Sequence, residues 1–387
     1  MEQKILKEED LEIGKPVDWH IYDGKGRLLL KKGMALRTEG QIRKLISLES
    51  YAKIDEFSII ELKKVSISDE LSPFHAIENV LSQLKRLFNE IVHQPADQKK
   101  QFVNRFTDLS KSIIDLCEYD LDATIGAIHI GQGYDYTIVH PLHCAILCYV
   151  LATSAEFEEE QIISITNAAL TANLGMYELQ KELTKQMTKL LPEQREEIDK
   201  HTMRSAVLLK RMGVADKLWL EIVLQHHEKQ DGTGYPRKLA GKEFVPEARI
   251  VALADRYHAM VSPRNYREGL SPTEALKMIF QARGKEVDES LGAVLIKKMG
   301  IYPPGSIVKL ASLETAIVTR RTENKMAPNV KSIVNPDARQ YGRPRIRDSS
   351  HKKFKIIGLC PAPQNYRYNL ASLWDYEIES SSDSGEK

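Results

Sequence analysis

The pattern of apolar and polar positions begins with a short β-rich stretch. Residues 17–22 alternate apolar and polar side chains, a turn signal follows at 23–26, and residues 27–30 predict a second strand. Ile42, Leu45 and Ile46 fall on one face of residues 38–48, which predicts a short helix. We therefore expect a small β-rich N-terminal domain, of the α+β kind, over residues 1–66.

The spacing of apolar positions changes over residues 69–119. It becomes helical there and predicts two amphipathic helices joined near Pro95. These helices could form a bundle lid or a dimerising hairpin, or they could pack on the domain that follows, and we prefer packing on the next domain. Residues 67–122 are thus predicted to be a helical connector, with a homodimer through 69–119 as the alternative.

Helical spacing continues through the middle of the chain. Good helix-start signals, such as Pro192-Glu193 and Asp288-Glu289, precede several of the apolar runs. The predicted helices cover residues 136–153, 158–178, 192–212, 217–228, 246–261, 272–283 and 288–299. We expect an all-α domain over residues 123–301.

The pattern returns to strands after residue 302. Residues 306–310 and 315–319 predict short strands around a turn. Residues 320–356 carry eleven Lys or Arg against three acidic residues, a local net charge of +8. This stretch is either an anion-binding surface or, in the simpler interpretation, a solvated loop. We expect a small basic β-module over 302–378 and a disordered tail over 379–387.

Length and composition narrow the class of protein. The 387 residues suggest two to three domains, and 42% hydrophobic with 28% charged residues is ordinary for a soluble globular chain. A net charge of +1 argues against binding a nucleic acid polymer or an anionic membrane. The sequence shows no secretory signal, no apolar run long enough to span a membrane and no disulfide framework among four cysteines. We therefore expect a cytoplasmic protein.

Histidine is the residue type that most clearly suggests chemistry. Helices of a bundle can aim side chains at one interior point, and imidazole and carboxylate are usual ligands of zinc, iron and manganese. Five such side chains lie on or at the ends of predicted helices: His140, His201, His226, His227 and Asp255. A tight Gly- and Pro-containing loop follows the adjacent histidine pair, and backbone N–H groups in such a loop can hold phosphate oxygens.

The segment His226-His227-Glu228 followed by Asp231-Gly232-Thr233-Gly234-Tyr235-Pro236 resembles the signature of the HD-GYP family. That family belongs to the HD superfamily of metal-dependent phosphohydrolases and hydrolyses bacterial cyclic di-GMP. The resemblance covers about residues 125–320 and includes the stretches 136–140, 248–255 and 264–267. It implies a mainly α fold, an HD-superfamily helical bundle flanked by a small N-terminal α+β unit and a small C-terminal β-module.

The same resemblance implies roles for particular residues. It implies five metal ligands: His140, His201, His226, His227 and Asp255. It also implies six substrate-binding residues: Gly232, Gly234, Tyr235, Pro236, Arg264 and Arg267. His201, His226 and His227 would share one metal position, and three imidazoles suit a single zinc or iron. We expect either one divalent metal (iron, manganese or zinc) or none.

The chain departs from the family at the residues for which the family is named. Ala172 replaces the family's histidine, Asn173 its aspartate and Met176 its lysine, and His258 stands where a second acid is common. A bridging aspartate holds two cations with two anionic oxygens, whereas asparagine offers one neutral oxygen and alanine none. Without that bridge a two-metal hydrolytic centre should fail. We therefore assign no catalytic residue.

Three functional hypotheses follow from the resemblance and its departures. The first is a hydrolytically impaired protein of bacterial cyclic di-GMP signalling that acts as a regulatory module or as a module that binds a nucleotide or a partner. The second is an active metal-dependent cyclic di-GMP phosphodiesterase that uses the retained ligands. The third is a protein-interaction module, with a diguanylate cyclase (GGDEF) domain as the implied partner.

Two further groups have simple structural interpretations. Three residues spaced four apart share a helix face: His140, Cys144 and Cys148. A soft-metal or redox site is one interpretation, and buried core thiols are the preferred one. Four acidic residues stand close together: Asp115, Glu118, Asp120 and Asp122. We interpret them as a solvated helix end.

Overall fold

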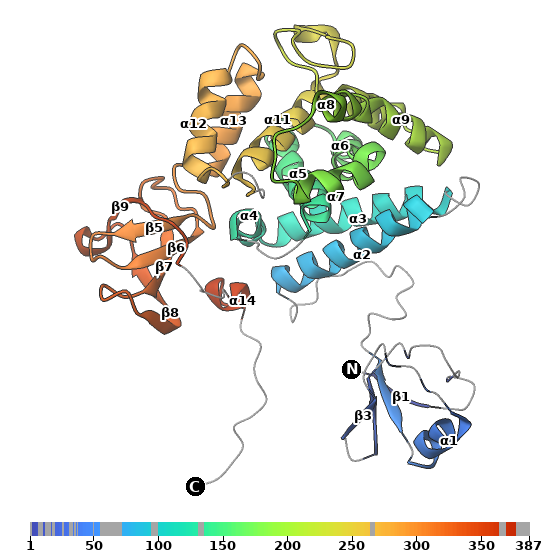
Figure 1. Ribbon diagram of the computed structural model, residues 1–387. Coiled ribbons are helices and arrows are strands. Elements are labelled where there is room, and N and C mark those ends of the chain that lie inside the picture. The colour runs from blue at the N-terminus through green and yellow to red at the C-terminus, as the bar shows by residue number, and fades with distance from the viewer. Residues whose placement is uncertain are drawn as a thin grey trace. The chain divides into compact units, whose positions relative to one another are not determined.

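The chain forms two compact units, residues 1–64 and residues 65–387 (Figure 1). Each unit is described here by itself. The computed structural model describes residues 2–6, 11, 17, 20–24, 27–30, 34, 36, 38–48, 50–54, 72–93, 100–130, 135–263, 268–363 and 369–376.

The first unit is a four-stranded antiparallel sheet with one helix. Its strands are β1 (Glu2–Ile5), β2 (Ile21–Tyr22), β3 (Leu28–Leu30) and β4 (Tyr51–Ile54), in the order β1-β4-β2-β3. Helix α1 (Glu39–Ser47) begins after Thr38, whose hydroxyl accepts the Gln41 N–H while the Gln41 side chain accepts the Thr38 N–H. The predicted helix and the hairpin strands are confirmed, and β1 and β4 were not predicted.

The second unit is mainly α, which confirms the predicted fold class. Its α-helices are α2 (Pro73–His93), α3 (Lys100–Tyr119), α4 (Leu121–Ile130), α5 (Tyr136–Ser154), α6 (Glu159–Thr171), α7 (Tyr177–Lys185), α8 (Pro192–Asp199), α9 (His201–Arg211), α10 (Lys217–Gln225), α11 (Pro246–Val261), α12 (Pro272–Ala282), α13 (Glu289–Met299) and α14 (Leu370–Leu373). Short 3₁₀ turns lie at η3 (Leu174–Met176), η4 (Gly241–Glu243) and η5 (Lys352–Phe354).

Helix α5 lies at the centre of this unit and packs against α6 and α11. By length and composition alone it is apolar enough to cross a membrane, but 78% of its most apolar window is buried inside the fold. Within the described residues it is the one helix that meets this test. Its apolar character is therefore that of a core helix.

Helices α2 and α3 pack their apolar faces into the same core (Figure 1). Leu84, Phe88 and Phe106 are buried, and the Phe88 ring meets the Tyr177 ring edge-on with 5.1 Å between centroids. The preferred interpretation, packing on the following domain, is thus the one observed. The apolar faces on which a homodimer through 69–119 would depend are therefore buried within the same chain.

Two helices that the apolar spacing predicts as continuous are interrupted. The prediction for 158–178 was wrong because α6 ends at Thr171, and η3 and α7 follow. The prediction for 192–212 was wrong at Lys200, which separates α8 from α9. Apolar residues keep helical spacing through both breaks, so periodicity does not reveal them.

The C-terminal part is a five-stranded antiparallel sheet packed beside the helices. Its strands are β5 (Ile307–Leu310), β6 (Thr315–Arg320), β7 (Asn329–Val334), β8 (Gln340–Asp348) and β9 (Ile356–Leu359), in the order β8-β7-β6-β5-β9. Side chains alternate across β6: Ile317 joins the helical core, whereas Ala316 and Val318 face the sheet's own core. The solvated-loop interpretation of 320–356 was wrong, since β7 and β8 occupy much of that stretch.

A buried ion pair fixes the turn between β5 and β6. The Glu314 side chain is 4% exposed, and its oxygens accept from Arg347 at 2.6 and 3.0 Å. Burial alone would raise the pKa of Glu314, but hydrogen bonds from Arg347, Tyr341 and Ser312 outweigh it and lower the pKa to about 2.

Two acidic residues at the start of α4 join the sheet to the helices. The Asp120 carboxylate accepts from Arg320 at 2.8 Å and from the Tyr376 hydroxyl at 2.8 Å. Asp122 pairs with Arg321. The solvated-end interpretation was therefore wrong for Asp120 and Asp122, which are structural ion-pair partners.

Candidate metal and ligand site

Three histidines from two helix ends converge in the helical unit. His201 begins α9, His226 is the C-cap of α10, and His227 follows it. The His201 and His226 Nε2 atoms are 3.3 Å apart, and the His226 and His227 ring centroids are 4.2 Å apart. Each of the three offers a nitrogen within 4.8 Å of the others, so the group can hold a metal ion.

Backbone carbonyls orient two of these rings. His201 Nδ1 contacts the carbonyl of Ile198, and His226 Nδ1 contacts that of Val223 at 2.7 Å. An Nδ1–H that donates to a carbonyl leaves Nε2 with its lone pair directed at the centre, as in metal-binding histidines. Burial, followed by the charge of His226, lowers the pKa of His201 to about 3, so this ring is neutral near pH 7.

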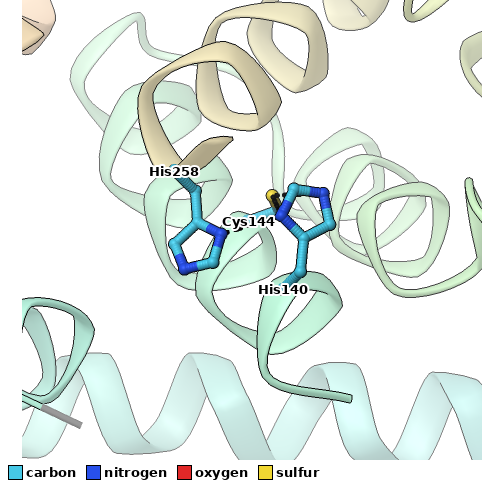
Figure 2. A group of neighbouring side chains, drawn as sticks. All are labelled: His140, Cys144 and His258. Atoms are coloured by element: carbon cyan, nitrogen blue, oxygen red, sulfur yellow. Dashed lines mark hydrogen bonds between the residues drawn. The ribbon is translucent and has the colours of Figure 1, made fainter. Parts of the chain in front are cut away.

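A second group of side chains lies on the facing helices α5 and α11. His140 Nε2 is 2.8 Å from Asp255 Oδ1, and His140 Nδ1 is 2.8 Å from His258 Nδ1. Figure 2 shows the two rings facing each other, with the Cys144 sulfur beside His140. Burial alone would raise the pKa of Asp255, but the hydrogen bond and charge of His140 hold it well below its usual range.

The position that the resemblance assigns to the family's His-Asp pair lies at the break between α6 and α7. Ala172 is the C-cap of α6, and its carbonyl accepts the Ser205 hydroxyl at 2.7 Å, while that hydroxyl accepts the Gly175 N–H at 2.8 Å. The Asn173 side chain is buried, and its Oδ1 has no hydrogen-bond partner in the structure. One neutral oxygen thus stands where the resemblance to the HD-GYP family implies a carboxylate.

The loop after the histidine pair is fixed by a buried carboxylate. Glu228 accepts the N–H of Arg237 at 2.7 Å through one oxygen and the N–H of Leu239 at 2.9 Å through the other. Gly234 lies so close to the chain that a Cβ there would be 2.5 Å from the His227 carbonyl oxygen. The loop places the Tyr235 ring on the His227 ring, with 4.7 Å between centroids.

A cavity of about 240 Å³ joins these parts. Side chains from both histidine groups line it, among them His140, His227 and Asp255, together with Asn173 and Met176. A second cavity of about 450 Å³ shares His227 and Asp255 and extends toward α12 and α13. The site is therefore open on two sides of the His227–Asp255 region.

One cationic side chain lines the first cavity, in which the resemblance implies a lysine at the position of Met176. Arg195 on α8 lines the cavity, and its guanidinium carbon lies 5.6 Å from the centre of the Tyr235 ring. Arg195 also pairs with Asp199 at 2.9 Å. Sequence analysis did not single out Arg195, since it lies among exposed charged residues of an ordinary helix.

The structure brings all five proposed metal ligands to this site, in two groups. Of the proposed loop contacts, Tyr235 lines the first cavity, whereas Gly232, Gly234 and Pro236 line neither of the two. Arg264 and Arg267 lie outside the described residues. Cys144 and His258 join His140 in a second possible metal-binding group, which was not predicted as such.

Comparison with known proteins agrees with this arrangement. Residues 134–291 match the family model described as HD domain. A cyclic di-GMP phosphodiesterase of Pseudomonas aeruginosa is 26% identical over 65% of this chain and 62% of its own length. A probable cyclic di-GMP phosphodiesterase of Vibrio cholerae is 37% identical over 30% of this chain and 29% of its own length. Both alignments thus span less than two thirds of the relative.

A solved structure shares the fold. It is described as an HDG"Y"P protein from Bdellovibrio bacteriovorus, is 18% identical, and aligns with a TM-score of 0.53 over 76% of this chain and 99% of its own. The family match coincides with the helices that carry both histidine groups and the loop ending in Tyr235-Pro236. Residues 134–291 of this chain thus form an HD domain, and the chain is similar to proteins of the HD-GYP type.

Proposed function

We propose that this HD domain binds a cyclic dinucleotide of the cyclic di-GMP type and hydrolyses it poorly or not at all, so that it acts as a regulatory module. The observation that carries the proposal is the pair Ala172 and Asn173 at the break after α6. Asn173 lines the first cavity together with His140 and His227, and neither Ala172 nor Asn173 supplies a carboxylate.

Binding is supported by the relatives and by the cavity. Several similar proteins are named cyclic di-GMP phosphodiesterases. The cavity combines an aromatic ring, Tyr235, with the cation of Arg195, and a cyclic dinucleotide offers bases that stack and phosphates that pair with a guanidinium. A diguanylate cyclase domain is a further partner implied by the resemblance.

Loss of hydrolysis follows from the metal chemistry. A two-metal centre activates water and clamps the attacking and leaving oxygens, and it needs an anionic ligand shared by both ions. The Asn173 amide brings one oxygen and no charge. His201, His226 and His227 would still hold one divalent ion, since three neutral imidazoles suit zinc or iron.

The test compares binding with turnover in the full chain. We expect calorimetry to detect cyclic di-GMP binding, and we expect incubation with Mn²⁺ or Fe²⁺ to yield no linear product above that of the His226→Ala/His227→Ala double variant. Absence of binding would overturn the nucleotide part of the proposal. Turnover well above that of the double variant would overturn the loss of hydrolysis.

Restoring the missing ligands tests the cause. The double change Ala172→His/Asn173→Asp should raise metal content and create hydrolysis, because the backbone there is already held by Ser205. The single change Met176→Lys is the matched control, since it restores a cation but no bridge. Equal activity in both variants would contradict the bridging argument.

An active phosphodiesterase is the second candidate. The observation in its favour is that the five proposed ligands lie in two groups, and that both groups contribute to one cavity, which the unpartnered side chain of Asn173 also lines. An asparagine oxygen can bind a divalent cation. Fewer than about one metal ion per purified chain would count against this candidate.

A further inference from the structure

The C-terminal sheet concentrates positive charge on a folded scaffold. Residues 320–356 have a net charge of +8, and the whole chain has +1, so the residues outside this stretch carry −7. Much of the stretch forms β7, β8 and the η5 turn. Four of its eleven cations form ion pairs within the chain: Arg320, Arg321, Lys331 and Arg347.

Five other cations, on or just after β8, lack a counter-charge in the described part of the chain. All five are exposed, and no ion pair joins them to a described carboxylate: Arg343, Arg345, Lys352, Lys353 and Lys355. The acidic residue among them in the sequence, Asp348, accepts the backbone N–H and the hydroxyl of Ser350 instead. We call these five cations the basic surface.

A buried carboxylate orders the side chains beneath the basic surface. Glu314 is 4% exposed, accepts from Arg347 at 2.6 Å and also accepts the Tyr341 hydroxyl. The guanidinium carbon of Arg345 lies 4.3 Å from the centre of the Tyr341 ring, and that of Arg347 lies 4.9 Å from the centre of the Phe354 ring. Arg345 and Arg347 are two residues apart on β8, so they lie on the same face of the strand.

Two exposed cations of this face are held ready for an anion. Arg347 is neutralised by Glu314, whereas Arg345 and Lys353 are not neutralised, and the Lys353 Nζ lies 5.5 Å from the centre of the Phe354 ring. Stacking on Tyr341 restricts the Arg345 guanidinium but leaves its N–H edge open, so less conformational entropy is lost on binding. A guanidinium edge matches the two oxygens of a carboxylate.

We propose that the basic surface binds an extended acidic segment of another protein, with Arg345 and Lys353 as its main contacts. The inference goes beyond the proposed function, because the basic surface lines neither of the two cavities and its binding needs no nucleotide.

The position of β8 favours an extended partner. The strand lies at one end of the sheet, where β7 is its single neighbour among the described strands (Figure 1). Side chains on one face of an extended chain repeat about every 6.8 Å, so a peptide with an acid at every second residue matches the repeat of β8. Pro344 has no N–H, so the contact depends on side chains and not on a continued backbone ladder. A second copy of β8 would bring the same cations and be repelled.

The same features disfavour a nucleic acid. Single strands bind proteins by stacking bases on open aromatic faces, but the Tyr341 and Phe354 rings here carry Arg345 and Arg347. A long polyanion would also extend from the basic surface toward the rest of the chain, whose net charge is −7. A short acidic segment meets neither obstacle.

A charged edge strand also has a simpler use. Cations on an edge keep other strands from pairing with it, and that use requires no partner. The two interpretations differ in their expectation for a free acidic peptide, which binds only if the basic surface is a docking site.

The experiment titrates the purified full chain into a fluorescein-labelled decapeptide of alternating threonine and glutamate and follows fluorescence anisotropy. We expect saturable binding that weakens as salt is added, and no binding of the same peptide with glutamine in place of glutamate. Arg345→Glu/Lys353→Glu should weaken binding about tenfold or more, since both attractions become repulsions. Lys217→Glu/Lys277→Glu is the matched control, because it makes the same change in net charge at exposed positions of α10 and α12 and should bind as wild type does.

Four results would overturn the proposal. Absence of binding to wild type at low salt would leave edge protection as the role of these cations. Equal loss in both double variants would show that net charge alone attracts the peptide. Tighter binding of a single-stranded oligonucleotide of equal charge would assign the basic surface to nucleic acid. Tighter peptide binding after Glu377→Gln, Glu379→Gln and Asp383→Asn are combined would show that the chain's own acidic residues occupy it.

Discussion

Replacing Glu228 by glutamine tests how the loop over the histidines is held. The Glu228 side chain is buried and uses one oxygen for the Arg237 N–H and the other for the Leu239 N–H. Glutamine has nearly the same shape but only one accepting oxygen, so its NH₂ group would face a backbone N–H. The substitution therefore removes one hydrogen bond and leaves the glutamine NH₂ group facing a buried backbone N–H, so that two donors meet without an acceptor.

The size of the effect follows from those contacts. A hydrogen bond to a charged group contributes about 1.5–3 kcal/mol, and an unsatisfied buried donor costs about 1–3 kcal/mol. Since glutamine can relax part of this cost, we expect a loss of roughly 3 kcal/mol from the free energy that holds the loop closed. That corresponds to an increase of about 150-fold in its opening equilibrium.

Hydrogen exchange measured by mass spectrometry can follow this loop directly. Backbone amides of residues 229–240 should exchange faster in Glu228→Gln, while those of α5 should change little. Glu243→Gln is the matched control, because Glu243 accepts the Ala240 N–H in the same loop but is exposed. Equal loop exchange in wild type and Glu228→Gln would refute the claim that this carboxylate holds the loop.

Three further perturbations test other parts of the structure. The folded-state pKa of Glu314 is about 2, whereas its ordinary value is 4.5, so its ionised form adds roughly 3 kcal/mol of stability above pH 4.5 that is lost as pH falls toward 2. Glu314→Gln, which leaves the half-buried Arg347 beside a neutral partner, should remove this dependence in acid unfolding. Gly234→Ala should lower metal content of the histidine group, measured by elemental analysis, since a Cβ there meets the backbone at 2.5 Å. Gly126→Ala should displace Trp374 from α4 and shift its fluorescence, because the added methyl group would overlap the indole.

Sequence reasoning worked best where chemistry is local. The adjacent pair His226 and His227, with the loop that follows, identified the family from a few residues. The structure then placed His201 against His226, as the resemblance implied. The spacing of apolar residues also gave α11 with its observed bounds.

It worked less well where partners are distant in the chain. His140 and His258 are 118 residues apart in the sequence. We therefore interpreted His258 only as the replacement of an acidic residue, and its position near Cys144 was not predicted. Strand β8 was missed because both of its faces are largely exposed and it lacks apolar alternation. The sequence could not show the partner of Asp120, since Arg320 lies on β6, 200 residues farther along the chain.

The packing of α2 and α3 determines how short a fragment of this protein can be and still keep its hydrophobic core covered. The family match begins at residue 134, yet Leu84, Phe88 and Phe106 from upstream fill the hydrophobic interior shared with it. A fragment limited to 134–291 would present that surface to water and should precipitate or bind detergent. The start of the family match and the start of an autonomous folding unit are therefore different places in this chain.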